Sequence, residues 1–557
     1  MPGIGRAQVG PPVRLAPAGT LVPVPPPTPR PAIGQVPQPL GSSGITVDQL
    51  APPSPDGLGA LGPNDRRLPP TLWQGTSRAG AEPLIPRIRP STSPTLQDLA
   101  FRLLASPAAP PAGDKPNGGA LLALRAERLT ALGRADSALA LLQSAPQAGG
   151  GEDVARVVVD LAFLSGNTQA ACEGARSRDP SWQGPYWDQA TVTCQALAGQ
   201  VDQAQLGLDM LREAKVRDDG FSTVVLKAAG VDAKLPDILP SPQTMSLALL
   251  QKAGQPLPKK ALDAASLAIL RTVALGEGFP PDQRLVAAEK AATYGAIAPE
   301  RLADAYLAAE FTDEDRQSPL NRAKTAGGAR AHAILFHAAR DATQIAAKAN
   351  FLAAYLGDAR SDAYPALVRA AAGLLTEVPA SGDLKSVAPD FARAFYALDQ
   401  PRAARVWYDL AAPDAQVALL PLAHAVAGDA APAWAGVTLT DLAGGKKDAA
   451  APRRAAATAL LLAAEGVALP DQMLLPLADP GAASLTSPAA GPAALMAVAA
   501  ADKRLGGTLL ALFTSLGDQG IGTQPVLAAQ AVAALRQVGL PDEARHLAID
   551  AALAEGL

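Results

Sequence analysis

Three glycines at equal spacing place the strongest constraint on this chain of 557 residues. Gly133, Gly166 and Gly199 follow one another at intervals of 33 residues. An apolar stretch with helical periodicity precedes each glycine, and a short polar turn after it opens a second such stretch. Glycine ends a helix in the left-handed conformation at little steric cost. The spacing therefore predicts helix-turn-helix hairpins joined by glycine hinges.

An alanine follows each of these glycines by five residues, at Ala138, Ala171 and Ala204. A side chain this small permits the two antiparallel helices of a hairpin to approach closely. One hairpin cannot bury its own apolar face, whereas stacked hairpins bury it between them. We therefore expect an all-α fold, an α-solenoid of helix-turn-helix repeats.

The hinge pattern recurs towards the C-terminus at less regular spacing. Three further pairs of residues follow it, namely Asp399 with Ala404, Gly428 with Ala433, and Gly539 with Ala544. Pro401 and Pro541 come two residues after their hinges, where proline suits the first turn of a helix. The six hinges together predict that hairpins extend to the end of the chain.

These hinges resemble those of the tetratricopeptide-repeat family, whose period is about 34 residues. The resemblance is clear over 119–214, fragmentary over 391–434 and 528–557, and without a strict register over 235–387. The tryptophan and tyrosine usual on the first helix of that family are missing from most units. The resemblance implies a protein-binding scaffold and names no partner.

The distribution of proline divides the chain. Residues 1–44 are rich in proline and are expected to form a disordered or semi-rigid arm, a spacer or a docking peptide. Residues 45–92 gain leucine, isoleucine and Trp73, which predicts an extended strap anchored on the body by that tryptophan. Ser93 and Pro94 provide an N-cap and a first helical residue. The helical body that follows is expected to comprise tetratricopeptide-like repeats over 93–235, irregular helical repeats over 236–465, and C-terminal helical repeats over 466–557.

Cys172 and Cys194 are the only cysteines, and they fall on the second helix of one hairpin and the first helix of the next. Because those helices pack against each other, a disulfide between the two is predicted, with two small buried hydrophobic residues as the alternative. A disulfide indicates an oxidising compartment, so we expect the periplasm. The start of the sequence does not read as a secretory signal peptide, which favours the alternative, the cytoplasm.

Three aromatic residues between the cysteines, Trp182, Tyr186 and Trp187, are candidates for a partner-binding surface. The alternative is that they fill the space between neighbouring hairpins. Aromatic residues make up only 4% of the chain, so such a concentration is uncommon in it.

Composition and motifs exclude several classes of function. A net charge of −4 provides no field for gripping a phosphate backbone, so nucleic-acid binding is not expected. No apolar run reaches the length of about 20 residues that a membrane-spanning helix needs, so membrane insertion is not expected either. Gly57 to Gly62 match a dinucleotide-binding spacing without the flanking strand and helix, and the glycine-lysine sequence at 444–447 reads as a loop.

Chemistry-bearing side chains are sparse. His332 and His337 are five residues apart, which does not suit a zinc-binding helix, and we expect them to be solvated or capping residues. Thr312 before the acidic run at 313–315 is typical of a helix start. We therefore predict no cofactor, no metal, no small-molecule substrate and no catalysis. The expected function is a scaffold in the bacterial cell envelope that binds an unknown protein. A cytoplasmic adaptor and a solenoid-bearing cell-wall hydrolase are the alternatives.

Overall fold

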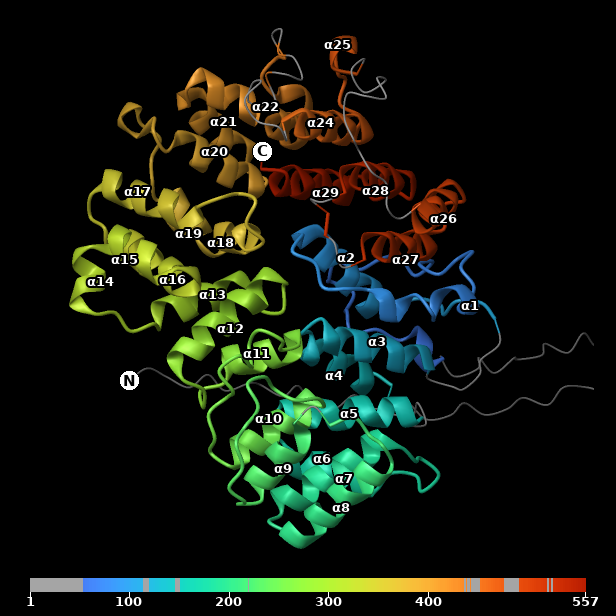
Figure 1. Ribbon diagram of the computed structural model, residues 1–557. Coiled ribbons are helices and arrows are strands. Elements are labelled where there is room, and N and C mark those ends of the chain that lie inside the picture. Colours follow the sequence, from blue (N-terminus) through green and yellow to red (C-terminus); the bar gives the residue numbers. More distant parts are fainter. Residues whose placement is uncertain are drawn as a thin grey trace, which may run out of the picture. The chain divides into compact units, whose positions relative to one another are not determined.

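Helices account for nearly all regular structure in this protein. The computed structural model describes residues 54–113, 120–145, 151–218, 220–434, 437, 441, 451–474, 490–517, 520–521 and 524–556. The arm predicted over 1–44 and the loop predicted over 444–447 lie outside these residues. The described residues contain no β-strand, only an isolated bridge between Ser77 and Ala112. The fold is all-α, as predicted (Figure 1).

Three hairpins occupy the region of the 33-residue spacing. Their helices are α3 (Ala120–Ala131), α4 (Ala135–Gln143), α5 (Glu152–Leu164), α6 (Thr168–Arg176), α7 (Pro185–Leu197) and α8 (Val201–Glu213). Gly133, Gly166 and Gly199 join the helices of each pair with φ of 74°, 75° and 73°, which is the left-handed conformation. The alanine five residues after each hinge is buried where the two helices cross. The hairpin prediction is confirmed here.

The body continues through the region that lacks a strict register and on to the C-terminus. Its helices are α9 (Phe221–Ala228), α10 (Gln243–Lys252), α11 (Leu267–Leu275), α12 (Pro281–Thr293), α13 (Pro299–Leu307), α14 (Asp313–Gln317), α15 (Pro319–Ala326), α16 (Gly328–Asp341), α17 (Ile345–Leu356), α18 (Tyr364–Ala370), α19 (Ala372–Thr376), α20 (Ala388–Ala397), α21 (Pro401–Leu410), α22 (Pro413–Ala427), α24 (Ala451–Glu465), α25 (Asp471–Leu474), α26 (Ala490–Ala501), α27 (Leu505–Leu516), α28 (Pro525–Gln537) and α29 (Pro541–Ala554). Neighbours in sequence pack in pairs, for example α11 on α12, α20 on α21, and α28 on α29. The architecture is an α-solenoid of helix-turn-helix repeats.

One predicted hinge is wrong. Gly428 ends α22 with φ of 52°, but a short 3₁₀ turn, Gly428–Ala430, follows, and residues 431–434 after it are not helical. Ala431 precedes Pro432 and is extended, because the proline ring disfavours the helical conformation of the residue before it. Ala433 is consequently exposed rather than placed at a helix crossing. Asp399 and Gly539 do form hinges, with φ of 55° and 84°.

The strap, residues 54–92, packs along the helical body. It contains the 3₁₀ turns Pro55–Gly57 and Ile85–Arg87 and the short helix α1 (Arg78–Ala81). Trp73 is buried in the strap and lies against Gly506 of α27, where an added Cβ would come within 2.6 Å of the indole. The Gly506 amide donates a hydrogen bond to the Leu72 carbonyl at 2.9 Å. Trp73 thus lies in a groove of the body opened by a glycine far along the chain.

A fully buried arginine ties the strap to α3. The Arg125 guanidinium donates to the carbonyls of Leu104, Asp56, Leu58 and Ser106 at 2.7, 3.1, 2.7 and 3.0 Å. Burial lowers the pKa of Arg125 to about 10, while the charge of Asp56 opposes that shift. Backbone carbonyls that have no partner within a helix or sheet are thereby satisfied.

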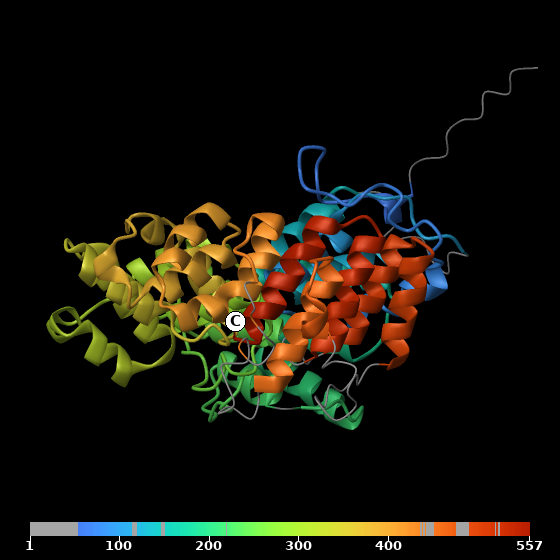
Figure 2. The same ribbon diagram turned by 90° about the horizontal axis from the view of Figure 1, so that it is seen from above.

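The last helix of the body packs against the first. The helix α2 (Pro94–Ala105) begins at its predicted N-cap, Ser93, and lies beside α29 in both views (Figure 1; Figure 2). Asp550 of α29 accepts hydrogen bonds from the Ser93 hydroxyl at 2.5 Å and from the Thr95 amide at 3.0 Å. The Arg102 guanidinium lies 2.6 Å from the Glu543 carboxylate, and both side chains are buried. The helical array therefore closes on itself.

Residues 53–557 form one compact unit by their contacts. The divisions predicted near residues 235 and 465 remain predictions. Among the helices of the described residues, none is both long enough and apolar enough to cross a membrane.

Candidate protein-binding groove

An apolar groove lies between the first hairpins and α11. It has a volume of about 580 Å³. We call it the hairpin groove. Its lining comes from α4, α5, the Gly166 hinge, α6, α10, α11 and the turn after α11: Ala135, Asp136, Leu139, Val158, Leu161, Ala162, Leu164, Ser165, Gly166, Asn167, Ala170, Gln251, Arg271, Thr272, Leu275, Gly276 and Phe279.

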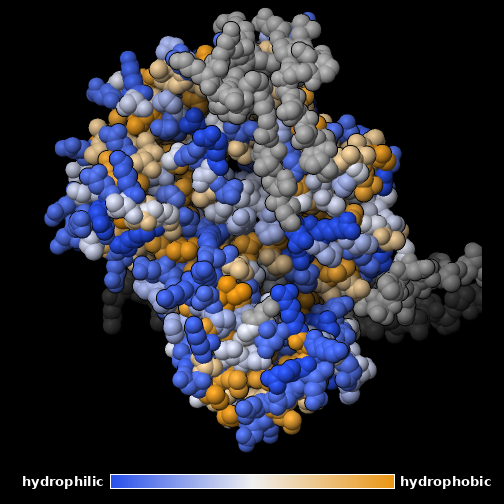
Figure 3. Space-filling model, viewed as in Figure 1, coloured by the Kyte–Doolittle hydropathy of each residue, from blue (hydrophilic) through white to orange (hydrophobic). Residues whose placement is uncertain are grey.

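Three large aliphatic side chains on different helices are exposed in this groove. Leu139 of α4 and Val158 of α5 are each 44% exposed, and Leu275 at the end of α11 is 41% exposed. Scattered exposed leucines are ordinary, but converging ones in a concavity mark a contact surface. On the face that Figure 3 shows, hydrophobic and hydrophilic residues are interspersed. The hairpin groove is therefore the candidate functional site.

One ion pair provides the fixed charge at the edge of the groove. The Arg271 guanidinium pairs with the Asp136 carboxylate and also donates to the Ala296 carbonyl at 2.8 Å. Arg271 is mostly buried, whereas the Asp136 side chain is 82% exposed. The carbonyl fixes the guanidinium in place, so a partner meets an exposed carboxylate beside an apolar floor.

The hinge at Gly166 forms one wall of the groove and is rigid for a local reason. The Asn167 side chain caps α6 by accepting a hydrogen bond from the Ala170 amide at 3.1 Å.

Sequence reasoning missed this groove because its residues come from separate hairpins. A signal existed in the runs of aliphatic residues at 138–142 and 157–159, which exceed what one buried helix face needs.

Of the three aromatic candidates, Trp187 is buried, and Trp182 and Tyr186 are partly buried. Trp187 has none of its side chain exposed, and its indole donates to the Glu152 carboxylate at 2.9 Å. Tyr186 donates to the Arg156 carbonyl at 3.0 Å, and burial raises the pKa of its hydroxyl. Trp182 is half-buried and stacks on Trp187 with ring centroids 5.9 Å apart. Trp187 fills the space between α5 and α7, which is the alternative interpretation, and a partner-binding role for Trp182 and Tyr186 stays a prediction.

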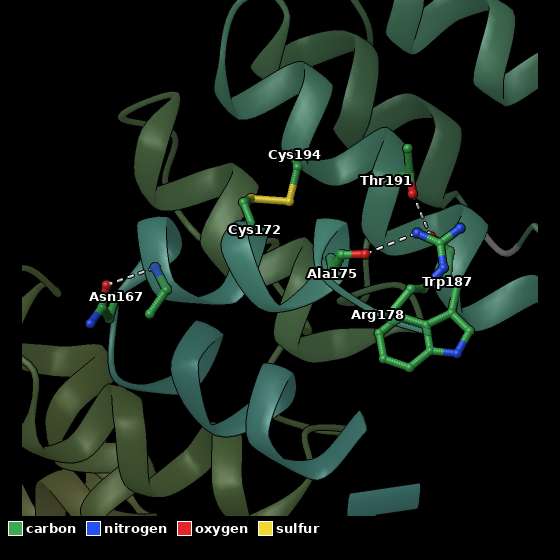
Figure 4. The surroundings of a disulfide bond; sticks show 8 residues. Asn167, Cys172, Ala175, Arg178, Trp187, Thr191 and Cys194 are labelled. Atoms are coloured by element: carbon green, nitrogen blue, oxygen red, sulfur yellow. Dashed lines mark hydrogen bonds between the residues drawn. A yellow bond between two sulfur atoms is a disulfide. The ribbon is translucent and has the colours of Figure 1, made fainter. Parts of the chain in front are cut away.

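The two cysteines are joined by a disulfide between α6 and α7. Their Cα atoms are 5.6 Å apart. Figure 4 shows the bond between the second helix of one hairpin and the first helix of the next, on the same helices as Ala175 and Trp187. Arg178 lies close by and donates to the Ala175 carbonyl at 2.9 Å. The bond links two neighbouring hairpins covalently, beside the helices that form the groove.

His332 and His337 are partly buried, and each has a polar partner. The Nδ1 atom of His332 lies 2.7 Å from the Glu289 carboxylate, which also accepts a hydrogen bond from Tyr306 at 2.7 Å. His337 lies against Phe311, with ring centroids 4.6 Å apart. Thr312 and Asp315 form the capping box of α14, which confirms the helix start predicted there. Among the residues whose positions are described, no cluster of three potential metal ligands occurs.

Comparison of the chain with models of known protein families, with curated proteins and with solved structures finds no match.

Proposed function

We propose that this protein is a non-catalytic scaffold that binds another protein through the hairpin groove. Its hairpins are inferred to be tetratricopeptide-like, on the strength of the 33-residue spacing and the glycine hinges. The observation that supports binding most is the convergence of exposed Leu139, Val158 and Leu275 in one concavity. Solenoids of helical hairpins commonly use such concave surfaces for extended contacts.

The proposed partner is a peptide segment with aliphatic side chains. The walls of the groove are largely aliphatic, and its exposed acid, Asp136, lies at the edge beside Arg271. A basic side chain on the partner would meet the Asp136 carboxylate at this edge while its aliphatic neighbours occupy the floor. Apolar contact supplies most of the affinity in such a groove, and the charge fixes the direction of the peptide.

We further propose that the scaffold works in the bacterial cell envelope, in the periplasm. The disulfide between Cys172 and Cys194 supports this location, because such bonds persist in oxidising compartments and are rare in the cytosol. Alkylation of native protein under non-reducing conditions tests it. Two blocked thiols support the proposal, and two freely alkylated thiols in protein from its own cells overturn it in favour of the cytoplasm.

Site-specific photo-crosslinking in the native cells tests the binding surface. A photoreactive residue replaces Leu139 or Leu275 in the groove, and a matched control replaces Leu206 on α8, which is 63% exposed outside it. The proposal expects a discrete crosslinked protein from both groove positions and none from position 206. Equal crosslinking at all three positions, or none at the groove positions, would contradict it.

A further inference from the structure

A second cavity lies where the two ends of the helical array meet. It has a volume of about 390 Å³ and is separate from the hairpin groove. Its walls come from the strap, α2, α18, the α20–α21 hinge and α29. We call it the closure cavity. The strap and α2 meet α18, the α20–α21 hinge and α29 here, because α29 packs on α2.

Most charged side chains of the closure cavity are already paired. Arg66 lies 4.0 Å from the Asp98 carboxylate and 3.3 Å from that of Glu543. Asp399 binds Arg545 at 2.6 Å and lies 3.1 Å from the Nε2 atom of His546. Among the ionisable residues of the lining, this leaves one cation, Arg369, and one anion, Asp550, without an ion pair to any described residue.

Arg369 is open to the cavity and yet surrounded by protein. Its side chain is exposed on α18 and makes no hydrogen bond to a described residue. Loss of solvation against the cavity walls lowers its pKa, and the charges of Asp550 and Asp98 oppose that shift. A guanidinium in this setting gains more from a bound carboxylate than one on an open surface does.

Asp550 is the complementary group. Its Oδ2 atom accepts the hydrogen bonds from Ser93 and Thr95 that hold the start of α2. Its Oδ1 atom has no described donor. Of the two carboxylates whose charges raise the pKa of Arg369, Asp550 has the larger effect, although the two residues form no ion pair. The cavity therefore presents one unpaired cation and one unpaired anion to the same space.

We propose that the closure cavity binds a small zwitterion of the amino-acid or short-peptide class. Its carboxylate would bind Arg369 and its ammonium group would bind the free oxygen of Asp550. Asp98, Asp399 and Glu543 also line the cavity, so a phosphate or a polycarboxylate would meet repulsion. Because α2, α18 and α29 all contribute to the walls, an occupant also stabilises the contact between the two ends of the array.

Calorimetric titration of the full chain tests this proposal, with glycine, glycylglycine and triglycine as the zwitterionic probes. Acetate, ethylamine and inorganic phosphate represent the anion alone, the cation alone and the competing anion. We expect saturable binding of at least one zwitterion, and at least about tenfold weaker binding of each single-charge probe, since a lost charged hydrogen bond is worth that factor. Binding of phosphate or acetate as strong as that of the best zwitterion would overturn the proposal in favour of a plain anion site.

Variants assign the binding to the two residues. Arg369→Met removes the guanidinium from a side chain that makes no described hydrogen bond, so the fold should tolerate it. Asp550→Asn keeps an oxygen that can accept from Ser93 and Thr95 but removes the charge. Each should weaken the zwitterion at least about tenfold. Arg301→Met, on an arginine 66% exposed on α13, is the matched control and should bind normally.

Failure of the proposal has two clear forms. Absence of saturable heat for all three zwitterions up to the high millimolar range would overturn it. Unchanged binding in the Arg369→Met variant, with that variant folded by circular dichroism, would do the same. Neither result bears on the hairpin groove, because the groove shares no lining residue with this cavity.

Discussion

The hairpins of α5 to α8 and those nearer the C-terminus make the same turn with different residues. Gly166 and Gly199 have nothing within 4 Å of where a Cβ would stand, so only the left-handed backbone calls for glycine. Asp399 and Lys503 hold the equivalent place before α21 and α27, with φ of 55° and 58°. Asp399 compensates for its strained backbone by binding Arg545 and His546 of α29. Backbone conformation alone calls for glycine at Gly166 and Gly199, whereas contacts to α29 stabilise the aspartate at position 399.

The two regions also differ in what holds neighbouring helices together. The first region is linked by the disulfide between α6 and α7. The second region is linked to the start of the body by charged and polar contacts, above all between Arg102 and Glu543. The following changes separate these two modes, from the largest expected effect to the smallest.

Arg102→Met should have the largest effect, because it breaks a buried ion pair and leaves Glu543 with only the more distant Arg66. Removal of one partner of a buried pair costs about 3–5 kcal/mol of unfolding free energy. Arg212→Met, on an arginine 72% exposed on α8, is the matched control, with an expected cost of about 0–1 kcal/mol. Urea unfolding measures both. Equal small losses of unfolding free energy in the two variants would show that the contacts between α2 and α29 do not stabilise the fold.

Reduction of the disulfide should destabilise the first region by about 3 kcal/mol, the chain-entropy value for a loop of this size. The same loss is expected in a Cys172→Ala, Cys194→Ala double variant, which should no longer respond to reductant. Thermal unfolding with and without reductant measures the effect. An unchanged melting temperature would contradict the stabilising role of the bond.

Two aspartates should give opposite pH responses in the two regions. Burial raises the pKa of Asp160 in α5 to about 6 from an ordinary value of 3.8, although Thr244 donates to it at 2.8 Å. The folded protein therefore binds more protons at this carboxylate than the unfolded chain does. The free energy of unfolding falls as pH rises from about 4 to about 6. Arg545 lowers the pKa of Asp399. The contribution of Asp399 to the free energy of unfolding is therefore present above pH 4 and is lost as pH falls through the lowered pKa.

The two amide variants check these signs. The free energy of unfolding of Asp160→Asn should rise relative to that of the parent protein as pH rises, by about 3 kcal/mol above pH 6. Asp399→Asn should be less stable than the parent protein at neutral pH, and the difference in the free energy of unfolding should become smaller in acid. Urea unfolding at several pH values measures both, and responses of the same sign would contradict the contrast.

The hinge residues themselves should give the smallest effects. Gly166→Ala places a Cβ on a left-handed backbone and should cost about 1 kcal/mol. Asp399→Gly relieves that penalty but removes the contacts to α29, so it too should destabilise. The melting temperatures of the two variants and of the parent protein measure these effects. A net stabilisation by Asp399→Gly would show that its contacts do not select the residue.

The sequence predicted what local chemistry determines. Glycine hinges, the N-cap at Ser93 and the capping box at Thr312 are all read from neighbouring residues, and the structure has them. Lys503 gave no signal, because lysine is not a residue type that marks a positive φ. Gly428 gave a false one, because Pro432 prevents the second helix from starting.

The candidate sites depend on contacts that no local pattern contains. The hairpin groove brings Leu139 and Val158 together with Leu275, which is more than one hundred positions further along the chain. The closure cavity requires α29 to return to α2, and a solenoid need not close. The aromatic residues allowed two interpretations because a large side chain serves burial as readily as binding, and only the contacts of Trp187 show that it fills the space between hairpins.

Hydrogen–deuterium exchange of the full chain, alone and with the protein captured by crosslinking from Leu139 or Leu275, tests the scaffold proposal most directly. The account predicts added protection in residues 135–145, 151–170 and 267–279, which contribute to the hairpin groove, and no change over α8, residues 201–213. The Arg102→Met variant should lose protection in α2 and α29 and should keep the footprint in the groove. Protection over α8 instead, or none in the groove, would contradict the proposal that this protein binds its partner between its first hairpins and α11.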